Sequence, residues 1–90
     1  MANNFIGRSL VANLAEQNVE LNMAFINLIV NDSANTITVT FDEATTSSNV
    51  MVFKAGEQRT NIPVPFEKLY YKASADTSAF RIEGLAKAPF

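Results

Sequence analysis

Two pairs of adjacent residues carry the side chains best suited to binding chemistry in this sequence. Asp42 and Glu43 are neighbouring acids, and Tyr70 and Tyr71 are neighbouring aromatics. Hard cations take clustered carboxylate oxygens, but two acids are too few for a site, and in an extended chain their side chains diverge. We therefore expect no metal site here, and we expect residues 42–49 to form a solvent-exposed loop.

The tyrosine pair offers a different chemistry, because exposed aromatic rings on a β-sheet can stack on sugar rings. Tyr70 and Tyr71 are adjacent, so in a strand one ring faces inward and the other outward. A single ring makes a small platform, and the sequence has no tryptophan to enlarge it. We expect one core tyrosine and one surface or interface tyrosine, flanked by solvated lysines at positions 68 and 72.

Enzymatic chemistry finds little support in the residue types. The sequence has no cysteine and no histidine, which removes thiol catalysis, disulfides and zinc–thiolate sites, and the commonest general base at neutral pH. The nine acids lie in no recognisable motif, and the three glycines are isolated, so no phosphate-binding loop is present. We predict a protein that is not an enzyme and needs no cofactor.

Composition also limits the partners. The net charge is -2, and the seven lysines and arginines are scattered from Arg8 to Lys87. A phosphate backbone needs a clustered basic surface, so we expect no nucleic-acid partner. No apolar run reaches about 18 residues, and no signal-peptide pattern opens the chain, so we expect no membrane association.

Residues 25–41 hold the clearest local pattern. An apolar run leads to five small polar residues at 31–35, which tolerate turn geometry. Ile37, Val39 and Phe41 then alternate with threonines, which is the period of a strand with one buried face. We interpret this stretch as a β-hairpin, with a bulge or bend near Asn27, where a polar residue interrupts the apolar run.

Similar strand signals recur along the chain at 19–25, 50–53, 69–73 and 79–85. Residues 62–65 alternate apolar residues with prolines, which restricts them to an edge strand or a crossing segment. The spacing predicts an all-β fold, a small antiparallel β-sandwich or jelly-roll-like barrel of about six short strands. We assign the sandwich domain to residues 19–85 and a C-terminal tail to residues 86–90.

Residues 1–18 are ambiguous. Apolar side chains fall at the spacings of a short amphipathic helix, although Gly7 disfavours one. The alternative is an extended arm that docks on a neighbouring subunit. The apolar residues of the segment are Phe5, Ile6, Leu10, Val11 and Leu14.

A wider pattern runs from residue 26 to residue 85. It comprises an apolar strand ending in Asn-Asp-Ser (31–33), an alternating Thr/Val strand (36–41), a Lys-Ala-Gly-Glu turn (54–57), the proline-bearing crossing, Lys-Leu-Tyr-Tyr-Lys-Ala (68–73) and residues 76–84. In this pattern the chain resembles small virion proteins of tailed bacteriophages. The resemblance implies a structural role without catalytic residues. It also implies a place in the virion as a capsid decoration or cement protein, or a head–tail accessory subunit, bound to the major capsid protein or to a tail or connector protein.

A small domain without disulfides often depends on oligomerisation, and the apolar ends of this chain suit a homo-oligomer. A carbohydrate- or host-surface-binding β-module is the alternative function, with the tyrosine pair as its site. We expect the working surface at the two chain ends and in the loop at residues 42–49. The candidate interface residues are Phe5, Ile6, Leu10, Tyr70 and Phe90.

Overall fold

The computed structural model describes residues 5–87 and folds them into strands, with no helix among them. None of these residues therefore forms a helix that could span a membrane. Residues 5–87 are all-β, as predicted, with one strand more than expected. The seven strands are β1 (Phe5–Ala12), β2 (Gln17–Asn31), β3 (Ile37–Phe41), β4 (Met51–Phe53), β5 (Gln58–Ile62), β6 (Phe66–Ala73) and β7 (Ser78–Ala86).

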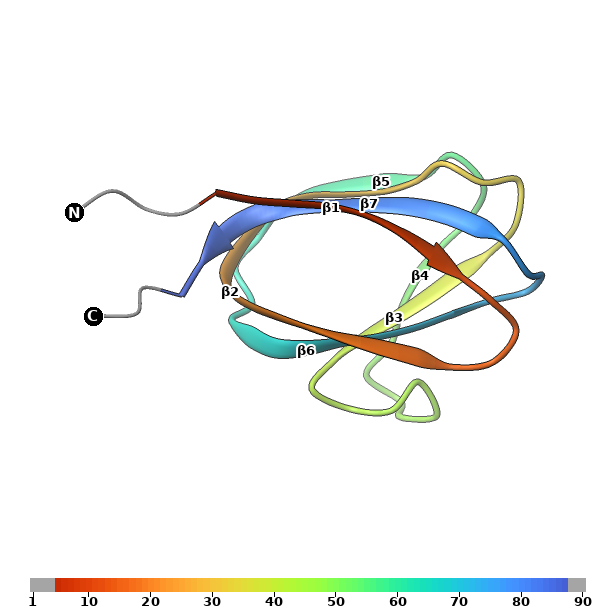
Figure 1. Ribbon diagram of the computed structural model, residues 1–90, viewed down its shortest axis with the longest axis horizontal. Helices are drawn as coiled ribbons and strands as arrows, with labels where there is room; N and C mark the ends of the chain where they lie inside the picture. The colour runs from red at the N-terminus through yellow and green to blue at the C-terminus, as the bar shows by residue number, and fades with distance from the viewer. Residues whose placement is uncertain (1–4, 88–90) are drawn as a thin grey trace.

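All the strands belong to one antiparallel sheet that curls into a half-barrel. The strand order is β1-β7-β2-β6-β3-β4, and β5 pairs with β2 away from this path. β2 is 15 residues long, and it pairs with β6 through its first half and with β5 and β7 through its second half. It therefore passes from one layer to the other, with β1, β7 and β5 on one side and β6, β3 and β4 on the other (Figure 1).

Irregular backbone positions let β2 make this crossing. Its register slips between Glu20 and Met23, where Asn22 takes a positive φ of 51°. A second shift against β7, between Ile26 and Leu28, confirms the bulge predicted near Asn27. A bulge bends a strand and raises its twist, which is what a strand shared by two layers requires.

Gly84 on β7 fits against the bent part of β2. A Cβ atom at this position would lie 2.2 Å from the backbone oxygen of Phe25 and 3.1 Å from the Cα of Ile26. No side chain fits in that space, so the contact between β7 and β2 requires glycine.

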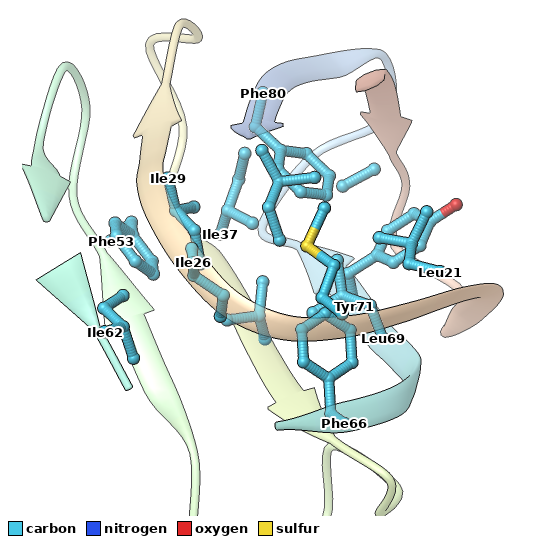
Figure 2. Close-up of a cluster of buried hydrophobic side chains, with 14 of the residues drawn as sticks. Leu21, Ile26, Ile29, Ile37, Phe53, Ile62, Phe66, Leu69, Tyr71 and Phe80 are labelled. Atoms are coloured by element: carbon cyan, nitrogen blue, oxygen red, sulfur yellow. The ribbon is translucent and has the colours of Figure 1, made fainter. Parts of the chain in front are cut away.

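The core lies between the two layers, where apolar residues from all seven strands meet (Figure 2). Tyr71 and Phe80 pack edge to face, with their ring centroids 5.2 Å apart. Fully burying a large apolar side chain contributes about 2 kcal/mol, so this cluster dominates the stability of a chain without disulfides. The large apolar side chains with the least exposure are Met23, Ile26, Ile29, Ile37, Phe53, Phe66, Leu69, Phe80 and Ile82.

The hairpin prediction for residues 25–41 was right in its elements and wrong in its pairing. Alternation in β3 is confirmed, because Ile37 and Val39 are buried. β3 pairs with β4 and β6, however, and not with β2. Both edges of the second half of β2 are already occupied by β5 and β7, so the turn at 31–35 carries the chain to the other layer.

The side chain of Asn31 organises that turn. Its oxygen accepts the Ser33 N–H at 2.9 Å, and its amide nitrogen donates to the carbonyl oxygens of Asn35, Phe53 and Lys54 at 2.6, 3.1 and 3.1 Å. Asn31 is buried, so these bonds satisfy a polar group that would otherwise destabilise the fold. The turn predicted from polar residues is thus confirmed.

The helix predicted for residues 1–18 was wrong over residues 5–12, which form β1. This strand pairs with β7 of its own chain along its whole length, from Phe5 opposite Leu85 to Ala12 opposite Ser78. The apolar residues divide between its two faces, with Ile6 and Leu10 toward the core and Phe5 and Val11 toward solvent. The arm that would reach a neighbouring subunit is therefore not formed by residues 5–12.

Candidate interaction surface

The exposed large apolar side chains of residues 5–87 gather at the two ends of the sheet. Phe5 is 60% exposed and Val11 47%, both on β1, and Leu14 in the following turn is 61% exposed. At the other end, Val52 on β4 is 40% exposed and Val50, just before it, 37%. End strands present backbone N–H and C=O groups without a strand partner, so apolar side chains there mark candidate contact surfaces.

Among residues 5–87, β1 is the longest strand with an edge that is unpaired along its whole length, since it has eight residues against three in β4 and five in β5. On its outward face an apolar row crosses three strands, because Phe5 lies opposite Leu85 of β7, and Leu85 lies opposite Phe25 of β2. The Phe5 ring leans over Gly7, and its Cε2 atom is 3.7 Å from the position of a Cβ at that glycine. The row lies at the end of the molecule where the chain enters β1 and leaves β7 (Figure 1).

The core-facing side of β1 is partly covered. Ile6 and Leu10 are half-buried and pack against the core. Arg8 lies between them and is exposed. The edge of β1 thus combines half-buried apolar side chains with one positive charge.

β4 differs from β1 because a charged side chain covers its outer edge. The strand has only three residues, and a turn at 54–57 connects it to β5. From β5, the Arg59 guanidinium donates to the Val52 carbonyl oxygen at 3.2 Å and lies 5.1 Å from the centre of the Phe53 ring. A charged side chain placed this way blocks the edge against another strand.

The structure brings together three of the five predicted interface residues, since Phe5, Ile6 and Leu10 all lie on β1. Tyr70 lies apart from them, half-buried on β6 in the other layer. Phe90 lies outside the described residues. The sequence patterns missed the apolar row through Leu85 and Phe25, because its members come from three strands whose order the sequence does not state.

The tyrosine pair divides between the two faces of β6, as predicted. Tyr71 is buried against Phe80, and burial raises the pKa of its phenol. Tyr70 points the other way, between Thr40 of β3 and Asn18 of β2 in the register of the sheet. Only Tyr70 is therefore accessible enough to contact a ligand.

The loop at residues 42–49 is more firmly held than the sequence suggested. The Asp42 carboxylate accepts the backbone N–H groups of Glu67 and Lys68 at 3.0 and 2.8 Å. Thr45 is buried, and its N–H and hydroxyl both donate to the Glu16 carboxylate, the former at 2.6 Å. Most of residues 42–49 are exposed, as expected, and the expectation was wrong at Thr45.

These bonds have an electrostatic consequence. Hydrogen bonds from the Thr45 hydroxyl and N–H, helped by the positive charge of Lys72, lower the pKa of the Glu16 carboxyl group. Asp32 and Arg81 form an ion pair of 2.7 Å on the exposed face, and the hydrogen bond from Arg81 lowers the pKa of Asp32. Within residues 5–87 no three potential metal-ligating side chains come together.

Comparisons with protein-family models, with curated proteins and with solved structures give no match to this chain.

Proposed function

We propose that this protein is a non-enzymatic structural subunit that acts through protein–protein contacts at β1. One observation carries the proposal: an eight-residue end strand whose outer side has no strand partner among residues 5–87 and which exposes Phe5 and Val11. Such an edge is a template for a further strand, whose backbone supplies hydrogen bonds and whose side chains supply specificity.

The setting we propose is the virion of a tailed bacteriophage, where the protein would be a capsid decoration, cement or head–tail accessory subunit. Its partners would be further copies of itself and a major capsid, tail or connector protein. The resemblance of residues 26–85 to such proteins supports this setting. A small chain without disulfides that leaves a long strand edge accessible is also suited to permanent assembly.

Purified particles provide the test. Phage particles released from the strain that carries the gene would be purified on a density gradient and analysed by quantitative mass spectrometry. We expect the protein at a fixed ratio to the major capsid protein. Particles without it would contradict the virion setting, as would its loss from the particles in a simple salt wash.

Two variants test whether incorporation into particles depends on the outward face of β1. Val11→Lys places a charge on the outward face of β1, and Val52→Lys makes the same change on β4 at similar exposure. We expect the first variant to be depleted from particles and the second to be incorporated normally. Equal incorporation of both variants would show that β1 is not the contact surface.

The alternative of a carbohydrate- or host-surface-binding module depends on Tyr70 alone, because Tyr71 is buried. No other observation favours it. Glycan-array binding that Tyr70→Ala abolishes without unfolding the domain would support it against the structural proposal.

A further inference from the structure

We propose that the occupant of the β1 edge is a second copy of this chain, with the two β1 strands antiparallel about a twofold axis. Ser9 lies opposite Ser9, Gly7 opposite Val11, and Arg8 opposite Leu10. The sheets of the two copies then form one continuous sheet. This inference deepens the proposed function, since it rests on β1 being the contact surface, and it names the partner and the register.

The two end strands differ in the pairing they allow. A head-to-tail contact would join β1 to β4 or to β5 of the next copy. β4 has only three residues and Arg59 covers its outer edge, while β5 has five residues, four of them polar. Two β1 strands can pair over most of their eight residues. The longer ladder favours the symmetric contact, which is also the commonest closed arrangement of identical subunits.

The exposed side chains of β1 complement one another in this register. Gly7 has no side chain, and the Phe5 ring leans toward it at 3.7 Å from the Cβ position. Val11 of the second copy lies opposite Gly7, so its methyl groups are diagonal to Phe5, within reach of an aromatic ring. The twofold axis repeats the contact, so both exposed apolar side chains of each β1 strand, Phe5 and Val11, are covered.

Arg8 distinguishes this register from its neighbours. Placing Phe5 directly opposite Val11 would set Arg8 against Arg8, and like charges directly opposite each other destabilise a strand pair. Placing Gly7 opposite Gly7 would carry Val11 beyond Phe5 of the other strand and leave it exposed. A slip by a single residue would exchange the two faces of the strand. The Ser9-centred register avoids all three faults.

Charge along the edge favours the same antiparallel direction. Near the Phe5 end, Arg8 lies on β1 itself, Glu83 lies opposite Gly7, and Lys87 follows the end of β7, so these three side chains together carry one positive charge. At the Ala12 end, the Asp76 carboxylate accepts the Leu14 N–H at 3.0 Å, and Glu16 lies two residues further on, near Lys72. That half is net negative. Antiparallel copies bring opposite ends together, and this attraction between exposed charges weakens as salt is added.

A single engineered thiol tests the register. The protein has no cysteine, so Ser9→Cys introduces one sulfur atom per copy at the proposed axis. Under mild oxidation we expect rapid formation of a covalent dimer. Ser48→Cys, in the exposed loop far along the chain, is the matched control and should cross-link slowly. Equal cross-linking rates for the two variants would overturn the proposed register.

Sedimentation equilibrium of the purified protein tests the contact itself. We expect a concentration-dependent dimer, a dissociation constant raised about tenfold or more by Val11→Lys, and no change with Val52→Lys. A wild-type protein that stays monomeric at about 1 mM would overturn the inference. So would equal loss of association in both variants, because that outcome indicates head-to-tail contact.

The inference and the proposed function fail separately. If the protein is a stable dimer but is missing from virions, the proposed function is wrong and the proposed dimer stands. If the protein is a monomer that is incorporated into virions through β1, the proposed dimer is wrong and the proposed function stands.

Discussion

β1 and β4 are both end strands of the same sheet, but their outer edges differ. A charged side chain covers the edge of β4, whereas the edge of β1 is left accessible. β4 is three residues long, and Arg59 donates a hydrogen bond to it and lies over its Phe53 ring. β1 is eight residues long, and its outward face exposes Phe5 and Val11. A curled sheet that does not close leaves edge strands, and here Arg59 blocks the edge of β4 while the longer edge of β1 stays accessible. β5 is a third edge among residues 5–87, because it pairs only with β2, but it is shorter than β1 and mostly polar. β1 is therefore the edge that leaves apolar side chains and backbone groups free to contact a partner.

The largest expected effect comes from breaking the support of β1. Gly84→Val puts a side chain where a Cβ already lies 2.2 Å from the Phe25 oxygen, which forces β7 away from β2. We expect the free energy of unfolding to fall by about 3 kcal/mol or more, measured by urea denaturation. Because β1 is held by β7, its edge should be lost as well.

Gly7→Ala is the matched control, since the nearest atoms to a Cβ there are 3.7 and 4.0 Å away. We expect a change within about 0.5 kcal/mol. A Gly84 variant as stable as the Gly7 variant would refute the close approach of β2 and β7.

The second-largest effect is expected when the hydrogen bonds that hold β4 are removed. Asn31→Ala removes the amide that donates to the carbonyl oxygens of Phe53 and Lys54. Because buried polar groups are left without partners, we expect a loss of about 2 kcal/mol. Hydrogen exchange should accelerate in β4 before it does in β1. Asn49→Ala, at an exposed position, is the control, and equal exchange in the two variants would contradict this role of Asn31.

A smaller effect is expected when the charge that covers the outer edge of β4 is removed. Arg59→Met keeps the aliphatic stem and removes the guanidinium, so we expect a loss of about 1 kcal/mol from the hydrogen bond and the cation–π contact. The edge of β4 also becomes accessible, so larger species should appear in sedimentation velocity at high concentration. Arg8→Met makes the same change on β1. If it produces the same species, Arg59 is not a specific block.

The smallest effect is a pH dependence at the loop. The folded protein lowers the pKa of Glu16, so the ionised carboxylate stabilises the fold. This contribution is complete above the ordinary pKa of a glutamate, and it is lost as the pH falls through the lowered value. Glu16→Gln should flatten the decline of stability in acid, measured by urea denaturation from neutral pH into the acid range. Glu67→Gln is the surface control, and an unchanged slope for Glu16→Gln would contradict the contact with Thr45.

Local alternation made several features predictable. The threonine-alternating segment became β3, residues 79–85 fall within β7, and Tyr70 and Tyr71 divide between two faces. These patterns depend only on neighbours along the chain, because successive side chains of a strand point to opposite faces. The polar turn at 31–35 was also readable, since Asn31 bonds the backbone two residues on.

Other features depend on contacts between residues that are far apart in the sequence, so local patterns did not predict them. The segment of β1 was left open between a helix and an extended arm, because its apolar residues serve two different faces, which mimics helical spacing. β5 was missed because most of its side chains are polar and exposed, and it is held by backbone pairing with β2. The loop at 42–49 was taken as fully exposed because Glu16, which binds Thr45, is far away in sequence.

By itself the sequence determined the all-β class, the buried face of most strands, and the absence of thiol and imidazole chemistry, because these follow from residue types and their local order. Only the tertiary structure decided which strands are neighbours, and therefore which edge is covered by Arg59 and which is left accessible at β1. The physical reason is that strand pairing uses backbone N–H and C=O groups, which are nearly the same in every residue, so an edge is defined by the strands that occupy the other positions.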